Sequence, residues 1–93
     1  MKKAHLVSPG DLVEAKSSYS LYVSDDRRSE RFIMDKNFPV LVVSVREDPA
    51  ARDVAGNLIS VCVLTSSPEL PLGWFYTYSS YFEDYFSILA PAP

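Results

Sequence analysis

Histidine, cysteine and glycine are scarce in this chain of 93 residues, which has one His, one Cys and three Gly. A single cysteine, Cys62, excludes an internal disulfide bond. A zinc site needs about four ligands at suitable spacing, and a catalytic triad needs a base beside its nucleophile. Neither arrangement can be assembled around His5, so the sequence predicts no metal site, no catalytic site and no bound cofactor. The isolated Gly10, Gly56 and Gly73 make no phosphate-binding loop.

Two pairs of adjacent acids, Asp25-Asp26 and Glu83-Asp84, are the remaining candidates for catalysis. Two carboxylates can serve glycosidase or aspartic chemistry, but adjacent acids are more often solvated turn or helix-cap residues. Asp25-Asp26 is followed by Arg27-Arg28, which indicates a loop tip whose charges compensate each other. The protein is therefore not expected to be an enzyme.

Long hydrophobic runs are also absent, because the longest are far below the length needed to cross a bilayer. Met1-Lys2-Lys3 is followed by no apolar segment, so no signal peptide is expected. The net charge of −3 and the pI near 4.9 disfavour electrostatic binding to nucleic acid. Cys62 lies within the apolar run Leu58–Leu64 and is expected to be buried and unreactive.

Residues 1–93 are expected to form a single domain, with a core over about 9–89, a short N-terminal arm and an Ala/Pro tail. Apolar alternation and β-branched density predict extended segments separated by turns. These segments are Leu12–Lys16, Tyr19–Val23, Arg31–Met34, Phe38–Val45, Leu58–Leu64, Gly73–Tyr78 and Phe86–Leu89. Val40–Val45 and Leu58–Leu64 are expected to pair antiparallel, joined by a polar loop over Arg46–Asn57. Aromatic residues at helical spacing predict one helical turn over Tyr81–Tyr85.

The order of these parts resembles the SH3-like small barrel superfamily. Pro9-Gly10-Asp11-Leu12-Val13 is similar to its Gly-Asp-hydrophobic-Val opening, and Phe38–Val45 resembles the central strand that follows a turn. Gly73-Trp74-Phe75-Tyr76, Ser79-Ser80-Tyr81-Phe82 and Phe86–Leu89 resemble the ending of the bacterial SH3-type group. The resemblance implies an all-β barrel of five or six antiparallel strands with one short helical turn near the C-terminus.

A stand-alone barrel of this kind is similar to accessory proteins of phages and bacteria. The resemblance implies a non-enzymatic protein-interaction or structural module within a larger assembly, in the cytoplasm or, for a phage protein, in the virion. Two alternatives stay open: a nucleic-acid-associated barrel, and an inhibitor that binds a host enzyme. The first requires a basic patch, for which the candidates are Lys2, Lys3, Lys16, Arg27, Arg28, Arg31 and Lys36.

Aromatic residues are concentrated near the end of the chain, where eight of the twelve lie between Trp74 and Phe86. In a strand-turn-strand ending, alternate side chains face the core. The residues expected there are Trp74 or Phe75, then Phe82, Phe86 and Ile88. The aromatic content exceeds what one small core can hold, so the other rings are expected at the surface.

The surplus rings define what we call the tyrosine face, whose residues are Trp74, Tyr76, Tyr78, Tyr81 and Tyr85. Tyrosine is amphipathic and enriched at protein interfaces, so this face is predicted to bind a protein partner, with Trp74 half-buried at its edge. Stacking on single-stranded nucleic acid usually needs interleaved cations, and no Lys or Arg occurs between Thr65 and Pro93. The sequence identifies neither the partner nor the oligomeric state.

Overall fold

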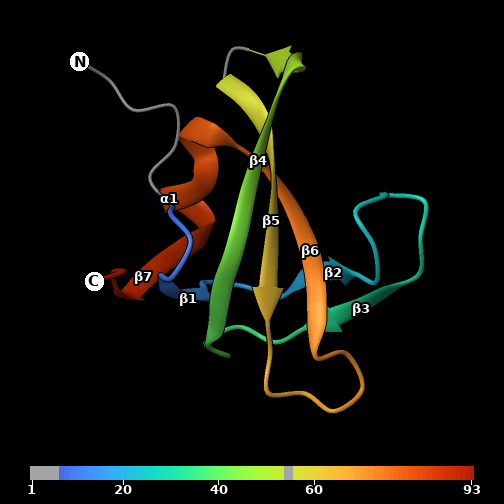
Figure 1. Ribbon diagram of the computed structural model, residues 1–93, viewed down its shortest axis with the longest axis vertical. Coiled ribbons are helices and arrows are strands. Elements are labelled where there is room, and N and C mark those ends of the chain that lie inside the picture. The colour runs from blue at the N-terminus through green and yellow to red at the C-terminus, as the bar shows by residue number, and fades with distance from the viewer. Residues whose placement is uncertain (1–6, 54–55) are drawn as a thin grey trace.

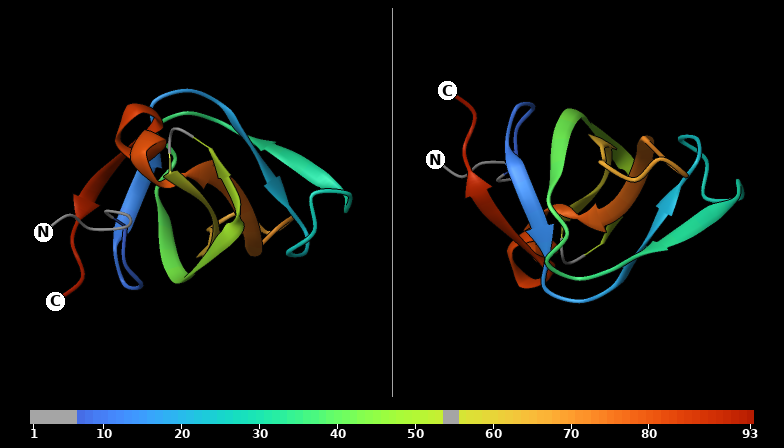
Figure 2. Two further views of the ribbon diagram at one scale, coloured as in Figure 1. Left: turned by 90° about the horizontal axis from the view of Figure 1, so that it is seen from above. Right: turned by 90° about the horizontal axis from the view of Figure 1, so that it is seen from below.

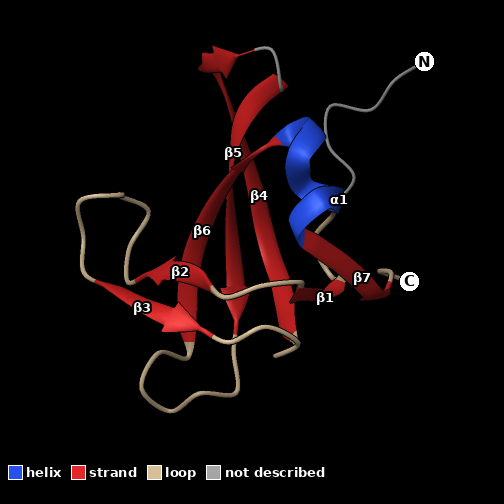
Figure 3. Ribbon diagram, turned by 180° about the vertical axis from the view of Figure 1, so that it is seen from behind, coloured by secondary structure: helices blue, strands red, loops and turns tan. Residues whose placement is uncertain are grey.

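Seven antiparallel strands form one sheet that curls into a half-barrel (Figure 1, Figure 2). The computed structural model describes residues 7–53 and 56–93. The strands are β1 (Leu12–Ala15), β2 (Tyr19–Tyr22), β3 (Arg31–Met34), β4 (Val40–Asp53), β5 (Gly56–Leu64), β6 (Leu72–Tyr78) and β7 (Phe86–Ala90). Their order across the sheet is β3-β2-β6-β5-β4-β1-β7. A 3-10 turn, η1 (Ser79–Tyr81), and one turn of helix, α1 (Phe82–Tyr85), join β6 to β7 (Figure 3).

The mostly β architecture and the helical turn near the C-terminus agree with the sequence, but the expected count of five or six strands is wrong. The sheet has seven because each of the short extended segments finds a strand partner. Tyr19–Tyr22 pairs along its whole length with Arg31–Met34, and Leu12–Ala15 pairs with both β4 and β7. Four residues suffice for a strand where neighbours supply the hydrogen bonds.

The central hairpin confirms the predicted antiparallel pairing of Val40–Val45 with Leu58–Leu64, in a register that sets Val45 opposite Val61. The expected loop over Arg46–Asn57 is wrong, because β4 continues to Asp53 and β5 begins at Gly56. The ladder tolerates the polar residues because they extend an existing pair of strands. A bulge between Asp48 and Arg52 holds Pro49 where no ladder N–H is required.

The sheet curls around the core (Figure 2), and alternate residues of the strands contribute their side chains to it. On β5, Ile59, Val61 and Val63 are fully buried and point into it. Across the ladder, Val61 faces Phe75 of β6 and Val63 faces Val42 of β4. Burying each such side chain contributes about 1.5–3 kcal/mol to folding, so this layer is a main source of stability.

Three phenylalanines close one end of the core. Phe75 and Phe86 stack with ring centroids 4.4 Å apart, and Phe82 and Phe86 stack at 5.2 Å. All three are at most 5% exposed, which confirms their predicted place in the core. The same prediction for Ile88 is wrong, because its side chain is 38% exposed. The reason is that β7 is an edge strand, and beyond Phe86 its residues are no longer buried.

A buried carboxylate joins the two ends of the described chain. Asp11, which is 4% exposed, accepts hydrogen bonds from the backbone N–H of Ser8 at 2.8 Å and of Ala92 at 2.7 Å. The backbone of Asp11 also accepts the N–H of Val42 at 2.9 Å. Asp11 therefore fixes the Ala/Pro tail against the turn that opens β1.

The helical segments of the described residues comprise three and four residues, and neither is long and apolar enough to span a membrane.

Candidate functional site

Strand β6 places the first three residues of the tyrosine face on the opposite side of the sheet from the core. Trp74, Tyr76 and Tyr78 alternate with the buried Phe75, and each is half-buried. The position of Trp74 at intermediate burial agrees with the sequence prediction. Trp74 lies between Cys62 of β5 and Tyr22 of β2, its register partners on either side.

The helical turn brings the other two residues of the tyrosine face beside the end of β6. Tyr81 and Tyr85 are 40% and 50% exposed. The rings of Tyr78 and Tyr81 meet edge to face at 6.5 Å, and those of Tyr81 and Tyr85 meet edge to face at 6.3 Å. The helix is too short to be stable alone, and the burial of Phe82 anchors it to the core. The structure therefore holds the half-buried Tyr78 and the exposed Tyr81 and Tyr85 in one continuous row of rings.

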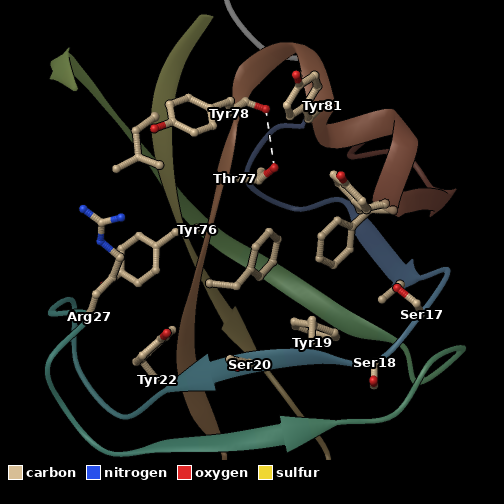
Figure 4. A pocket seen from close by; sticks show the side chains of 15 residues that line it. Ser17, Ser18, Tyr19, Ser20, Tyr22, Arg27, Tyr76, Thr77, Tyr78 and Tyr81 are labelled. Atoms are coloured by element: carbon tan, nitrogen blue, oxygen red, sulfur yellow. Dashed lines mark hydrogen bonds between the residues drawn. The ribbon is translucent and has the colours of Figure 1, made fainter. Parts of the chain in front are cut away.

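All six tyrosines of the chain line one groove with a volume of about 520 Å³ (Figure 4). We call it the tyrosine groove, and its tyrosines are Tyr19, Tyr22, Tyr76, Tyr78, Tyr81 and Tyr85. Phe75 and Phe86 also line it, and Arg27 is the one charged residue among its lining residues. Trp74 does not line it. The structure thus gathers four of the five residues of the predicted face and leaves the tryptophan outside.

The loop between β2 and β3 folds onto the outer face of the sheet through Asp25, in what we call the Asp25 hub. One carboxylate oxygen accepts hydrogen bonds from Ser60 Oγ at 2.7 Å and Tyr76 OH at 2.9 Å. The other accepts from Arg46 Nε at 3.0 Å, with Nη2 at 2.9 Å. The neighbouring Asp26 forms an ion pair with Arg28 at 3.5 Å within the loop, which agrees with the expectation that the acids and arginines of this loop compensate each other. Asp25 instead joins the loop to β4, β5 and β6.

The hub fixes one wall of the tyrosine groove. With its hydroxyl bound to Asp25, the Tyr76 ring packs edge to face on Tyr22 at 5.4 Å. The guanidinium of Arg27 lies 5.6 Å from the centre of the same ring, a distance at which cation–π attraction operates. The position of Arg27 beside the groove therefore follows from the loop that Asp25 anchors.

The hub changes the acidity of its members in opposite directions. Burial raises the pKa of Asp25, but the hydrogen bonds from Ser60, Tyr76 and Arg46 and the charge of Arg46 outweigh it and hold the pKa below its ordinary value of 3.8. Burial, together with the adjacent carboxylate of Asp25, raises the pKa of Tyr76 to about 12. Tyr76 is therefore a neutral hydrogen-bond donor across the physiological pH range.

We expect the Asp25→Asn variant to be less stable than the wild-type protein by about 1–2 kcal/mol at pH 7, because the charged acceptor of three side chains is lost. A depressed pKa contributes stability above the unfolded value, and that contribution disappears as the pH falls through the folded value. The stability difference should therefore be constant from pH 7 to about pH 5 and shrink below about pH 4. Urea unfolding of both proteins at each pH measures it.

The Asp35→Asn variant is the matched control, since Asp35 is an exposed acid in the turn after β3. Its stability should stay within about 0.5 kcal/mol of the wild-type value. An Asp25→Asn penalty that stays unchanged down to pH 2 would show that the carboxylate charge does not hold the loop.

The other residues singled out in the sequence have simpler surroundings. Cys62 is 5% exposed, and burial raises the pKa of its thiol. Its burial is confirmed, and its low reactivity stays a prediction. Glu83 and Asp84 lie exposed in α1, while His5 lies outside the described residues, as do Lys2 and Lys3. Over residues 7–53 and 56–93, no three His, Cys, Asp or Glu side chains gather in a metal-binding group.

Sequence reasoning missed the groove residues that come from the first third of the chain. Tyr19 packs edge to face on Phe75 at 5.6 Å and on Phe86 at 5.1 Å. Its hydroxyl is buried with no hydrogen-bond partner within the described part of the chain, and burial raises its pKa to about 12. Tyr22 and Arg27 reach the groove only because β2 pairs with β6. The alternating Tyr19-Ser20-Leu21-Tyr22 pattern was a usable signal for a strand, but not for its neighbour.

Comparison with protein-family models, with curated proteins and with solved structures found no match to this chain.

Proposed function

We propose that the protein is a non-enzymatic interaction module that binds a protein partner through the tyrosine groove. The observation that carries the proposal is the gathering of all six tyrosines around one open groove. Tyrosine is enriched at binding hot spots because a large, rigid ring and a hydroxyl come at a low entropic cost. Tyr78, Tyr81 and Tyr85 form a row of rings in which Tyr78 is half-buried and the other two are exposed.

The arrangement of the strands bears on the type of barrel. We infer an SH3-like barrel, and the support is the succession of short strands followed by a single helical turn before the last strand. On that basis the protein would serve as an accessory subunit of a phage or bacterial assembly, in the cytoplasm or the virion. An inhibitor of a host enzyme would use the groove in the same way, so the identity of the captured partner separates the two.

We expect Tyr78→Ala, Tyr81→Ala and Tyr85→Ala each to weaken partner binding by about 2 kcal/mol, or about thirtyfold in Kd. The rings are partly exposed, so each variant should lose about 1 kcal/mol of folding stability or less. The measurement is affinity capture from the native source with mass spectrometry, followed by titration of the captured partner. Thermal melting of each variant is recorded alongside.

The Ile33→Ala variant is the control, because Ile33 is 63% exposed on β3 and does not line the groove. It should capture the partner as well as the wild-type protein does. If all three tyrosine variants capture the partner as well as the wild-type protein does, the groove is not the binding surface.

A second candidate function is stacking on single-stranded nucleic acid. The observation that favours it is Arg27 over the Tyr76 ring, since cations beside aromatic rings are typical of such surfaces. The acidic residues Asp25, Glu83 and Asp84 near the same rings oppose it. Titration with single-stranded oligonucleotides at low salt tests it, because stacking would quench tyrosine fluorescence and binding would weaken steeply with salt.

A further inference from the structure

Strand β6 has two different edges. On one side it pairs with β5 along its whole length, from Leu64↔Leu72 to Leu58↔Tyr78. On the other side its register with β2 consists of the single pair Tyr22↔Trp74. Figure 4 shows β2 running across the lower part of β6 and away from it. Over 75–78 the described residues therefore supply no second strand beside β6.

The tyrosine groove lies along this open edge. Its lining includes four consecutive residues of β6, from Phe75 to Tyr78. Figure 4 shows Tyr76 and Tyr78 on one side of the strand, with Tyr19 and Tyr81 on the other. A groove that follows a strand edge and has rings on both sides fits the shape of an added strand, whose side chains alternate between two faces.

The open edge also has unused hydrogen-bonding capacity. Alternate residues of a strand direct their N–H and C=O groups away from each neighbour. The Tyr78 carbonyl is engaged at the start of η1, where Tyr78 is the N-cap residue, and it also accepts a bond from Thr77 Oγ1 at 3.5 Å, so the free groups of this edge lie before that carbonyl. An unpaired edge of this kind is a template for another chain in extended conformation.

We propose that the partner adds an extended segment to the sheet as a strand along Phe75–Tyr78, and that this segment carries an acidic side chain beside Arg27. The proposal rests on the proposed function and specifies the chemistry of its partner. Main-chain hydrogen bonds to β6 supply affinity, while the rings on the two sides of the strand select alternate side chains.

The charge of the segment follows from the surroundings of Arg27. Its guanidinium packs on the Tyr76 ring and forms no ion pair within the described residues. The nearby carboxylates are already engaged, since Asp25 accepts from Arg46 and Asp26 pairs with Arg28. Arg27 is therefore the free cation of the groove wall, and an acidic side chain is its natural complement.

A displayed library of random linear peptides of about ten residues is the probe, selected against the wild-type protein. We expect acidic peptides to be enriched. In a selected peptide, methylation of backbone nitrogens at alternate positions should weaken binding about tenfold, because each blocks one ladder hydrogen bond and introduces a clash. Methylation at the intervening positions should have little effect. Amide exchange should slow over 75–78 when the peptide binds.

Arg27→Gln tests the charge complement, with Arg28→Gln as its matched neighbour. The first variant should weaken the acidic peptide about two- to fivefold and reduce the salt dependence, as is typical of an exposed ion pair. The second should bind as the wild-type protein does, because Arg28 does not line the groove.

Four results would overturn the proposal: a library that yields no binder, peptides without acidic enrichment, binding that tolerates methylation at every position, or self-association of the protein through 75–78. These results leave the proposed function standing if the tyrosine variants still lose their captured partner. Conversely, the tyrosine variants could capture the partner normally while a peptide still adds as a strand. That result would show that the edge of β6 binds the partner and that the tyrosine rings do not contribute to the affinity.

Discussion

The Phe82→Ala variant is expected to lose about 3–5 kcal/mol of folding stability, whereas Tyr85→Ala should lose about 1 kcal/mol or less. Both aromatic residues lie in the same turn of α1, but Phe82 is 1% exposed and Tyr85 is 50% exposed. Phe82 stacks on Phe86, which in turn stacks on Phe75, so its removal opens a cavity at one end of the core. Urea unfolding monitored by Trp74 fluorescence measures the difference.

The difference in stability loss between Phe82→Ala and Tyr85→Ala distinguishes a core ring from a surface ring. The number of aromatic residues in the sequence does not make that distinction. A domain of this size has a modest total stability, so a loss of this size leaves much of the Phe82→Ala protein unfolded at 25 °C. Similar losses for the two variants would place Tyr85 in the core. In that case, loss of partner capture by Tyr85→Ala would report unfolding instead of a missing contact.

The Gly73→Val variant is expected to lose about 3 kcal/mol of folding stability, at the upper end of the range for overpacking. A Cβ atom at this position would lie 2.5 Å from Leu21 Cγ and 3.2 Å from the Tyr22 carbonyl oxygen. Leu21 is fully buried, so it has no free space into which to move. The same substitution would push β2 away from β6 at the Tyr22↔Trp74 pair. Thermal and urea unfolding measure the loss.

Thr77→Val is the control for Gly73→Val, because it introduces the same residue on the same strand at a half-buried position. Its stability should stay within about 0.5 kcal/mol of the wild-type value. If Gly73→Val is as stable as Thr77→Val, then β2 and β6 do not pack as closely as the structure places them.

Much of the fold could be predicted from the sequence because its signals are local. The β-branched runs Val40–Val45 and Leu58–Leu64 were identifiable as a hairpin from composition alone, and the aromatic spacing identified the helical turn. The extension of this hairpin through Arg46 to Asp53 was not predictable in the same way. Polar residues join a ladder when a partner strand is already in place, and single-sequence patterns do not report partners.

The residues of the candidate site also fall into two groups, those with a local sequence signal and those that depend on contacts between distant segments. The tyrosines after Phe75 were identifiable because they exceed what a small core can bury. The contributions of Tyr19, Tyr22 and Arg27 were not, because they depend on β2 lying beside β6 and on Asp25 reaching Ser60 and Tyr76. A carboxylate whose partners lie 21 to 51 positions away along the chain leaves no local pattern.

The pairing of β1 with β7 has a consequence for synthesis on the ribosome. In the finished sheet β1 has β4 on one side and β7 on the other, and β7 is the last of the seven strands to be translated. Until then one edge of Leu12–Ala15 is uncovered, and the buried Asp11 lacks the amide of Ala92. The half-barrel therefore cannot close progressively behind the emerging chain. Its folding should be a concerted event that waits for β7 to be translated, and until then the uncovered edge of β1 is available to chaperones.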